Sequence, residues 1–293
     1  MADKMVGGAT VNLTSLRVVR DLVCRYGIRP SRTQGQNFLV DRNVLERILE
    51  AAELTGQEVV LEIGCGLGTL TAALAERARW VVGVEKDPRC VAALRETLVA
   101  CPNVEVYEAD ALAAPLEEWL SCRTGTGRGV VVANLPYHIS KPLLQRLLAL
   151  RKRLDRLVLM LQREVAERLI AVPGSKTYGV LSIATQLYCE TELLRRVSPT
   201  CFWPPPEVES ALVRLRVREE PQVPLEDEEW FFTVVSAAFA QRRKTLRNAL
   251  RGLADHHTLQ EACRQVGLDP ARRGETLTLA EFAALSAALR LPI

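Results

Sequence analysis

Short apolar runs alternate with longer stretches of helical periodicity through the middle of this chain. The runs at residues 59–63, 80–84, 104–109 and 129–133 predict strands, and the last is typical of a strand buried in a parallel sheet. Strand and helix patterns alternate from about residue 59 to residue 161. This alternation predicts an α/β fold with a doubly wound, Rossmann-like sheet.

The pattern changes on both sides of this region. Residues 13–53 are predicted to be helical, with one helix capped by Asp41. A helix at 178–188 precedes two closing strands near 193–197 and 211–217. Residues 219–227, which contain Pro221 and Pro224, are typical of a linker, and residues 228–291 have helical periodicity. We therefore expect an α/β domain at 1–220, including the N-terminal helical segment, and a small all-helical domain at 221–293.

The run at 129–133 ends in an unusual tetrapeptide, Asn134-Leu135-Pro136-Tyr137. Ligands of open α/β sheets bind at the carboxyl ends of the strands. An Asn side-chain oxygen and a rigid main-chain carbonyl can both accept hydrogen bonds from an exocyclic amino group, and a Tyr can stack on the ring that carries it. The tetrapeptide predicts a site for a flipped-out nucleobase, with adenine as the expected base, although Asn-X-Pro alone is more often an ordinary turn.

A glycine-rich loop follows the first predicted strand. Gly64, Gly66 and Gly68 permit tight turning and close approach of a ligand to the backbone. Such a loop alone fits an oxidoreductase as well as a methyltransferase. The next two strands end in Glu85, placed to accept from ribose hydroxyls, and Asp110, suited to accept from an adenine amino group. Together the three strand ends suit S-adenosylmethionine.

The chain resembles the KsgA (RsmA) family of ribosomal RNA adenine dimethyltransferases over nearly its whole length. The resemblance depends on the order of several segments: Gln36-Asn37-Phe38-Leu39 with Asp41, residues 62–68, Glu85, residues 109–112, residues 134–137 with Ile139-Ser140, residues 162–168, Tyr178-Gly179, residues 202–206 with Val208 and Ser210, and residues 239–250. Two positions depart from the commonest family pattern. Cys65 stands where Pro or Ala is frequent, and His138 stands where Asn is frequent.

The resemblance implies a function and a set of site residues. The family dimethylates the N6 amino groups of two adjacent adenosines in a hairpin loop near the 3′ end of small-subunit (16S) ribosomal RNA, during subunit biogenesis. It implies a catalytic group of Asn134, Leu135, Pro136, Tyr137 and Phe202. The residues expected to bind S-adenosylmethionine are Gln36, Asn37, Leu39, Gly64, Gly66, Glu85, Asp110 and Asn134.

Phe202 begins a proline-rich segment, Phe202-Trp203-Pro204-Pro205-Pro206, whose prolines exclude helix. The family resemblance assigns Phe202 to the second face of the target base. The alternative is core packing, the usual position of a Phe side chain.

Composition is that of an ordinary globular chain: 293 residues, 48% hydrophobic and 25% charged. No apolar run approaches the length of a membrane span, and no signal-peptide pattern precedes residue 21. The eight cysteines show no zinc-ligand spacing, so reduced thiols in a cytoplasmic protein, with no metal and no membrane, are expected.

The net charge of only +3 does not itself indicate a nucleic-acid partner. Two basic clusters are more informative, because such clusters can contact RNA phosphates, although a single one is usually a solvated helix face. One contains Arg151, Lys152, Arg153 and Arg156. The other contains Arg242, Arg243, Lys244, Arg247 and Arg251, of which the first four are the predicted RNA contacts.

Three functions therefore remain open. The first is the small-subunit adenine dimethyltransferase, and the second is an Erm-type 23S ribosomal RNA adenine N6-methyltransferase. The third is a non-catalytic factor for small-subunit assembly, which the intact Gly64, Glu85, Asp110 and Asn134 disfavour. Residue Leu135, the proline-rich segment and residues 239–250 favour the first.

Overall fold

The computed structural model describes residues 12–30 and 36–290. They form two compact units, neither of which is contiguous in sequence. The first unit comprises residues up to 165 together with 193–216, and the second comprises 166–192 together with the residues from 217 onward. The sequence predicted one domain boundary, between residues 220 and 221. This position lies close to residue 217, where the chain enters the second unit for the last time, but the prediction assigned residues 166–192 to the first domain. The two predicted domains therefore stay a prediction.

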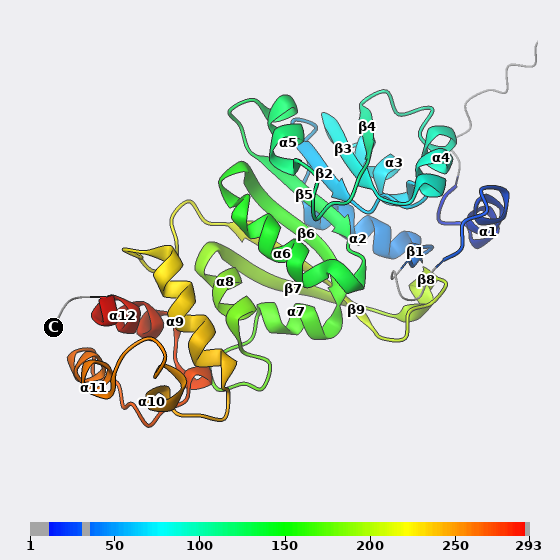
Figure 1. Ribbon diagram of the computed structural model, residues 1–293. Coiled ribbons are helices and arrows are strands. Elements are labelled where there is room, and N and C mark those ends of the chain that lie inside the picture. Colours follow the sequence, from blue (N-terminus) through cyan, green and yellow to red (C-terminus); the bar gives the residue numbers. More distant parts are fainter. Residues whose placement is uncertain (1–11, 31–35, 291–293) are drawn as a thin grey trace, which may run out of the picture. The chain divides into compact units, whose positions relative to one another are not determined.

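A seven-stranded sheet forms the centre of the first unit (Figure 1), with strand order β4-β3-β2-β5-β6-β9-β7. Its strands are β2 (Val59–Ile63), β3 (Trp80–Glu85), β4 (Val104–Glu108), β5 (Gly129–Asn134), β6 (Leu154–Gln162), β7 (Cys189–Val197) and β9 (Ser210–Val217). The pairs among β2 to β6 are parallel, and β9 pairs antiparallel with β6. The chain runs outward from β2 to β4 and then returns to β5 on the other side of β2. This reversal is the switch point at which such sheets bind ligands.

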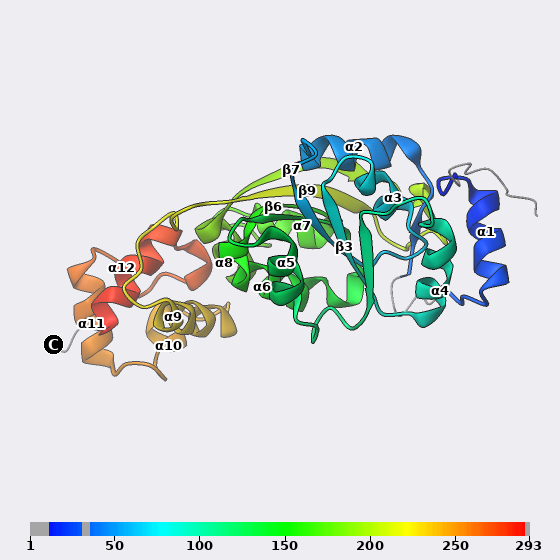
Figure 2. The same cartoon turned by 90° about the horizontal axis from the view of Figure 1, so that it is seen from above.

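Helices flank this sheet on both sides, as the sequence alternation predicted. Those of the first unit are α1 (Leu16–Arg25), α2 (Arg42–Ala52), α3 (Thr69–Ala75), α4 (Pro88–Thr97), α5 (Leu116–Thr124) and α6 (Ser140–Ala149), and α7 (Arg163–Leu169) follows β6. Helices α2 and α3 cover one face, and α5 and α6 the other (Figure 2). Because both faces are covered, all five residues of β2 are buried, which explains why every residue of this strand except Glu62 is apolar. Asp41 caps α2 as predicted, its carboxylate accepting from the Val44 amide at 3.0 Å.

Three strands differ from the sequence prediction. Strands β1 (Phe38–Leu39) and β8 (Phe202–Trp203) form a separate antiparallel pair in which Leu39 lies opposite Phe202. Strands of two residues show no periodicity from which they could be predicted. Strand β7 begins at Cys189, four residues before the predicted start, because the chain becomes extended directly after helix α8 (Val180–Tyr188).

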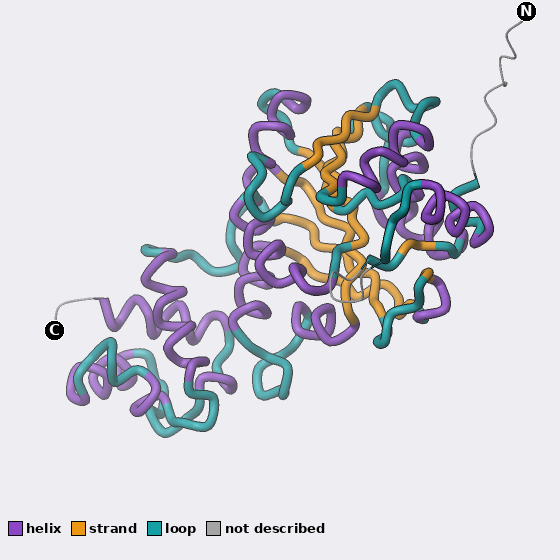
Figure 3. The backbone as a smooth tube through the Cα atoms, turned by 45° about the vertical axis from the view of Figure 1, so that its right-hand side comes forward, coloured by secondary structure: helices purple, strands orange, loops and turns teal. Residues whose placement is uncertain are grey.

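The second unit contains the predicted C-terminal helices. They are α9 (Glu228–Ala240), α10 (Leu246–Ala249), α11 (His256–Gln265) and α12 (Leu279–Arg290). Helices predominate here in Figure 3, whereas the strands gather in the first unit. Phe239 packs against both Tyr178 and Phe282, with ring centroids 5.8 and 5.9 Å apart. The buried Tyr178 hydroxyl donates to the Leu277 carbonyl at 3.0 Å, so aromatic rings and one satisfied hydroxyl organise this core.

Candidate active site

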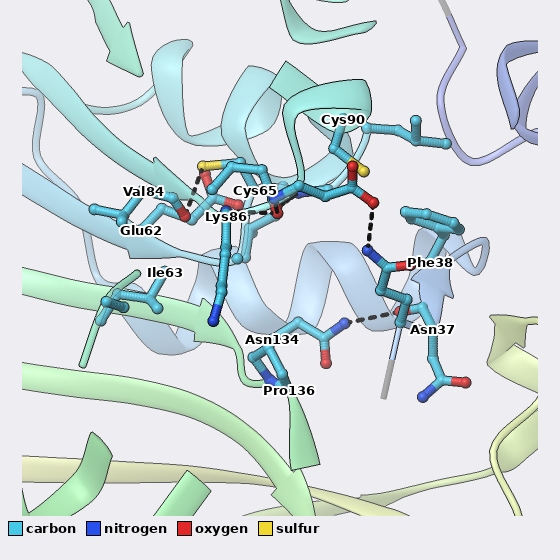
Figure 4. Close-up of a pocket in the computed structure, with 18 of the residues that line it drawn as sticks. Asn37, Phe38, Glu62, Ile63, Cys65, Val84, Lys86, Cys90, Asn134 and Pro136 are labelled. Atoms are coloured by element: carbon cyan, nitrogen blue, oxygen red, sulfur yellow. Dashed lines mark hydrogen bonds between the residues drawn. The ribbon is translucent and has the colours of Figure 1, made fainter. Parts of the chain in front are cut away.

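A cavity of about 540 Å³ opens at the carboxyl ends of β2, β3 and β5. Figure 4 shows it with the segment that carries Asn37 and Phe38 on one side. Nine of the residues predicted from the sequence line it: Gln36, Asn37, Leu39, Gly64, Gly66, Glu85, Asp110, Asn134 and Pro136. The fold thus brings five separate stretches of the chain together around one space large enough for a nucleoside cofactor.

The loop after β2 needs its glycines. Gly64 and Gly66 have positive φ angles of 79° and 56°, which L side chains rarely adopt. A Cβ atom on Gly66 would also lie 3.3 Å from the Phe38 ring. A side chain is therefore disfavoured at both positions by the backbone conformation, and at Gly66 also by the Phe38 ring, and the backbone of both residues lines the cavity.

Glu85, at the end of β3, holds this loop in place. Its Oε2 accepts from the Gly66 amide, and its Oε1 accepts from the amides of Lys86 and Asp87, each at 2.8 Å. The side chain is 8% exposed, and this burial raises the pKa of the Glu85 carboxyl despite the three hydrogen bonds, which lower it. A carboxylate has about four acceptor positions, so acceptor capacity remains for a ligand hydroxyl.

Asp110, which lies just after β4, lines the cavity and is held by two contacts. Its Oδ1 accepts from the Leu112 amide at 2.9 Å, and its Oδ2 pairs with the Lys86 ammonium group at 2.7 Å. The hydrogen bond from Lys86 is the main reason that the pKa of Asp110 is lowered. Lys86 is largely exposed, so this partner can move away at little cost.

Glu62 is a cavity residue that the sequence analysis did not single out as a site residue. It lies near the carboxyl end of β2 and is 1% exposed, and among the residues that the structure describes its buried Oε2 has no hydrogen-bond partner. Burial is the main cause that raises the pKa of Glu62 to about 8. Its signal in the sequence is an acid inside an otherwise apolar strand, which usually marks a functional or tightly bound group.

Asn134 lies where β5 ends and its side-chain amide is directed by a neighbour. Its Nδ2 donates to the main-chain carbonyl of Asn37 at 3.2 Å (Figure 4). The amide of Leu135 continues the sheet by donating to Met160 O at 3.1 Å, and the Leu135 side chain is buried. Pro136 follows and lines the cavity close to Gly64.

The two predicted aromatic residues lie differently. Tyr137 is half-buried, and its hydroxyl forms a 2.5 Å hydrogen bond with Ser210 Oγ. Burial raises the pKa of this hydroxyl. Phe202 is only 3% exposed and packs into the core with Leu39 and Ile48. Its pairing with β1 turns the ring into the core, as in the core-packing alternative, and a role of Phe202 in covering the target base stays a prediction.

Comparison with known proteins assigns the chain to a family. The model of the family described as ribosomal RNA adenine dimethylase matches residues 29–290. The chain belongs to the ribosomal RNA adenine dimethylase family. This membership confirms the resemblance read from the sequence motifs, and with it S-adenosylmethionine as the cofactor.

Relatives within this dimethylase family match nearly end to end. The ribosomal RNA small subunit methyltransferase A of Moorella thermoacetica is 46% identical over 275 residues, which cover 92% of this chain and 96% of the relative. The protein of the same name from Pelotomaculum thermopropionicum is 46% identical over 283 residues, covering 94% and 96%.

Two solved structures confirm the α/β fold class with its C-terminal helices. A dimethyladenosine transferase from Plasmodium falciparum superposes with a TM-score of 0.69 at 27% identity, over 84% of this chain and 95% of that one. The 23S rRNA methyltransferase ErmE gives 0.66 at 30% identity, over 87% and 100%. The fold is thus shared with a dimethyladenosine transferase and with a 23S rRNA methyltransferase.

The first basic cluster in this dimethylase chain is not uniformly exposed. Arg156 is buried, and its guanidinium donates to the carbonyls of Ala52 and Glu53 at 2.7 and 2.9 Å and pairs with Asp155. It therefore satisfies the C-terminal end of α2. The inclusion of Arg156 in an RNA-facing cluster was wrong, because spacing in the sequence does not distinguish a buried Arg from an exposed one.

The second basic cluster also divides. Arg242 donates to the carbonyls of Lys176 and Tyr178 and pairs with Glu275 at 3.1 Å, so it ties together separate parts of its own unit. Arg243, Lys244 and Arg247 are exposed on the same turn and the start of α10.

Among residues 12–30 and 36–290 there is no helix long and apolar enough to cross a membrane. The same residues include no group of three or more His, Cys, Asp or Glu side chains arranged to hold a metal ion.

Proposed function

We propose that this protein dimethylates the N6 amino groups of two adjacent adenosines in the hairpin loop near the 3′ end of 16S ribosomal RNA. The reaction takes place in the cytoplasm during small-subunit biogenesis, on RNA within the immature small subunit. The observation that carries this proposal is a single cavity that joins Gly64, Glu85 and Asp110 to Asn134 and Pro136. A cofactor site and an amino-group acceptor therefore share one enclosed space.

The residues present fit S-adenosylmethionine. The open backbone at Gly66 allows close approach, Glu85 keeps acceptor capacity for ribose hydroxyls, and Asp110 can accept from the adenine amino group once Lys86 moves. Gln36, Asn37, Leu39 and Gly64 complete the set that holds the cofactor, and Asn134 lines the same cavity on the side of the target amine. When bound, the cofactor supplies a methyl group on a positively charged sulfur, which makes that carbon a strong electrophile.

The target amine is a weak nucleophile, because its lone pair is delocalised into the purine ring. The Asn134 side-chain oxygen and the Leu135 carbonyl accept from the N6 hydrogens and favour a nitrogen whose lone pair points toward the methyl carbon. The proton becomes acidic only as the N–C bond forms, so no strong base is required beforehand. Positioning is thus the main contribution of these residues.

Tyr137 supplies the stacking face for the extruded base. Its hydroxyl is anchored on the buried Ser210, so the ring has little freedom to turn. An aromatic face of this kind contributes about 1–3 kcal/mol per stacked base. Pro136 stiffens the loop just before it, which keeps the acceptor carbonyl and the ring in a fixed relation.

Arg243, Lys244 and Arg247 contact RNA phosphates from the second unit. Exposed cations attract RNA without reading its sequence, so they supply affinity for the subunit, whereas the cavity selects the base. Arg242 holds the turn that presents them. Specificity for two adenines then comes from the shape of structured RNA around a single-stranded loop.

The small-subunit substrate is favoured over the 23S substrate by the degree of similarity. Relatives named as small-subunit methyltransferases are 46% identical over more than nine-tenths of the chain, against 30% for ErmE. A purely structural assembly role does not account for a cavity in which every predicted cofactor residue is present.

The test is to map N6-dimethyladenosine by mass spectrometry in ribosomal RNA from cells with and without the gene. Purified protein is then given three substrates at equal concentration and salt: unmethylated small subunits, the isolated hairpin, and 23S RNA. We expect efficient modification of small subunits, poor modification of the hairpin and none of 23S RNA. The Asn134→Ala variant should bind S-adenosylmethionine nearly normally while methyl transfer falls by about a hundredfold or more. Methylation of 23S RNA alone would contradict the proposal.

A further inference from the structure

The hydrogen bond between Asn37 and Asn134 has a fixed donor and a fixed acceptor. A main-chain carbonyl oxygen can only accept, and an Asn amide has one donating and one accepting end. The 3.2 Å hydrogen bond from Asn134 Nδ2 to the Asn37 carbonyl therefore fixes which end faces Asn37. The accepting Oδ1 is left on the other side of the group, as Figure 4 shows.

The Asn37 carbonyl is itself held on both sides. Before it, Gln36 Nε2 donates to Asp87 Oδ2 at 3.1 Å. After it, the buried Phe38 and Leu39 pair with β8, and the Val40 amide donates to Cys201 O at 2.9 Å. Asp87 in turn is fixed at the start of α4, where its Oδ1 accepts from the Arg89 amide at 2.9 Å. The acceptor that faces Asn134 is thus anchored to two separate parts of the first unit.

We propose that the Gln36-Asn37 segment is a positioning element for methyl transfer. Its Asn37 carbonyl sets the amide of Asn134 so that Oδ1 faces the target amine. If the amide turned over, its NH₂ group would meet the N6 hydrogens donor to donor, and the orienting hydrogen bond would be lost. The inference rests on the proposed role of Asn134 and adds the group that orients it.

The second methyl transfer should depend on this contact more than the first. After one transfer, N6 retains a single hydrogen, so fewer hydrogen bonds orient the nitrogen. A loosely held Asn134 amide then presents its acceptor for a smaller fraction of the time. Loss of the contact is therefore expected to make monomethylated adenosine accumulate, which a general loss of folding would not do.

The experiment compares Asn134→Asp with Asn134→Ala and the unmodified protein on unmethylated small subunits between pH 6 and pH 9. An ionised Asp has only acceptors and repels the Asn37 carbonyl, but a protonated Asp donates its O–H to that carbonyl and keeps a C=O acceptor for the amine. At pH 9 we expect Asn134→Asp to be at least about a hundredfold slower than the unmodified protein. Toward pH 6 the rate of Asn134→Asp relative to the unmodified protein should rise by about tenfold per pH unit, because the protonated fraction of a carboxyl grows by that factor at any pH above its pKa. Asn134→Ala should show no such recovery.

Calorimetry of S-adenosylmethionine binding at each pH checks that the variants are folded. Normal methylation by Asn134→Ala would overturn the proposed role of Asn134 itself. A slow Asn134→Ala together with a pH-independent ratio for Asn134→Asp would overturn only the positioning inference. Full activity of Asn134→Asp at pH 9 would also overturn the positioning inference, because a side chain that cannot donate to the Asn37 carbonyl would then be sufficient.

A second variant tests the hydrogen bond between Gln36 and Asp87. It is followed by product analysis and by NMR, and the NMR measurement does not require activity. Asp87→Ser keeps a capping oxygen for α4 but is too short to reach Gln36. We expect a several-fold higher ratio of monomethylated to dimethylated product at saturating cofactor. In the free protein, the side-chain amide protons of Asn134 should exchange with solvent faster, as measured by NMR. An unchanged product ratio and unchanged exchange would show that Asp87 does not take part.

Discussion

The Gly66 amide donates a 2.8 Å hydrogen bond to Glu85 Oε2, so the loop after one strand is fastened to the end of the next. The same carboxylate also binds the amides of Lys86 and Asp87. Glu85 therefore holds the glycine loop in shape without a ligand. The same carboxylate is also expected to accept hydrogen bonds from the ribose of the cofactor, so a substitution at this position affects both roles.

Replacing Glu85 with Ala should weaken S-adenosylmethionine binding by about 1.5–3 kcal/mol for each charge-assisted hydrogen bond lost. This corresponds to roughly a 10- to 150-fold rise in Kd by calorimetry. Glu108→Ala is the matched control, because Glu108 pairs with Glu85 in the sheet register but is exposed. Unchanged affinity in a folded Glu85→Ala variant would remove Glu85 from the cofactor site.

Glu62 should make the protein less stable as pH rises. The pKa of Glu62 in the folded state is raised to about 8, above its ordinary value. Between pH 5 and pH 8 the unfolded chain is ionised at this position while the folded protein keeps its proton. Glu62 thus lowers the free energy of unfolding by up to about 1.4 kcal/mol per pH unit in that window. Glu62→Gln, which cannot ionise, should remove this slope in urea unfolding measured at several pH values. Parallel pH profiles would show that Glu62 is ionised in the folded protein.

Arg156→Met should destabilise the first unit by about 3 kcal/mol or more, since the Ala52 and Glu53 carbonyls and nearby carboxylates lose a buried partner. Arg153→Met is the control, because Arg153 is partly exposed and makes a surface ion pair with Glu117. Denaturant midpoints measure both. Equal small effects would contradict the structural role assigned to Arg156.

Replacing Arg243, Lys244 and Arg247 together with Gln should weaken binding to small subunits and flatten its dependence on salt, with cofactor affinity unchanged. Arg242→Gln should instead lower the Tm of the protein, because it loses the contacts to Lys176, Tyr178 and Glu275. Filter binding at several salt concentrations and thermal unfolding separate the two effects. An unchanged salt slope for the triple variant would make this cluster a solvated surface.

The site residues that could be predicted are those whose position depends on sequence neighbours, such as the end of a strand or the start of a helix. Gly64, Glu85, Asp110 and Asn134 each lie at or just after the end of a strand, and parallel strands place such residues at one edge of the sheet. Asp41 could be predicted as a helix cap because its hydrogen bond reaches only three residues along the chain. Local patterns are sufficient for features of this kind.

Other features depend on contacts between distant segments. The burial of Phe202 follows from pairing with Leu39, and the burial of Arg156 follows from the end of α2, more than 100 residues earlier. A motif or a charge cluster does not contain that information. Glu62 could not be predicted as a site residue for a different reason. Its raised pKa depends on how completely the carboxyl is removed from water, and apolar neighbours in the sequence do not give the degree of burial.

The sheet order has a consequence for synthesis of the protein on the ribosome. Strand β9 lies between β6 and β7, although β7 leaves the ribosome first. Until residue 217 has emerged, the outer edge of β6 is unpaired and β7 has no strand to pair with. The catalytic sheet is therefore complete only after about three-quarters of the chain has been translated. A product that ends before β9 contains all the residues that line the cofactor cavity, but on an incomplete sheet.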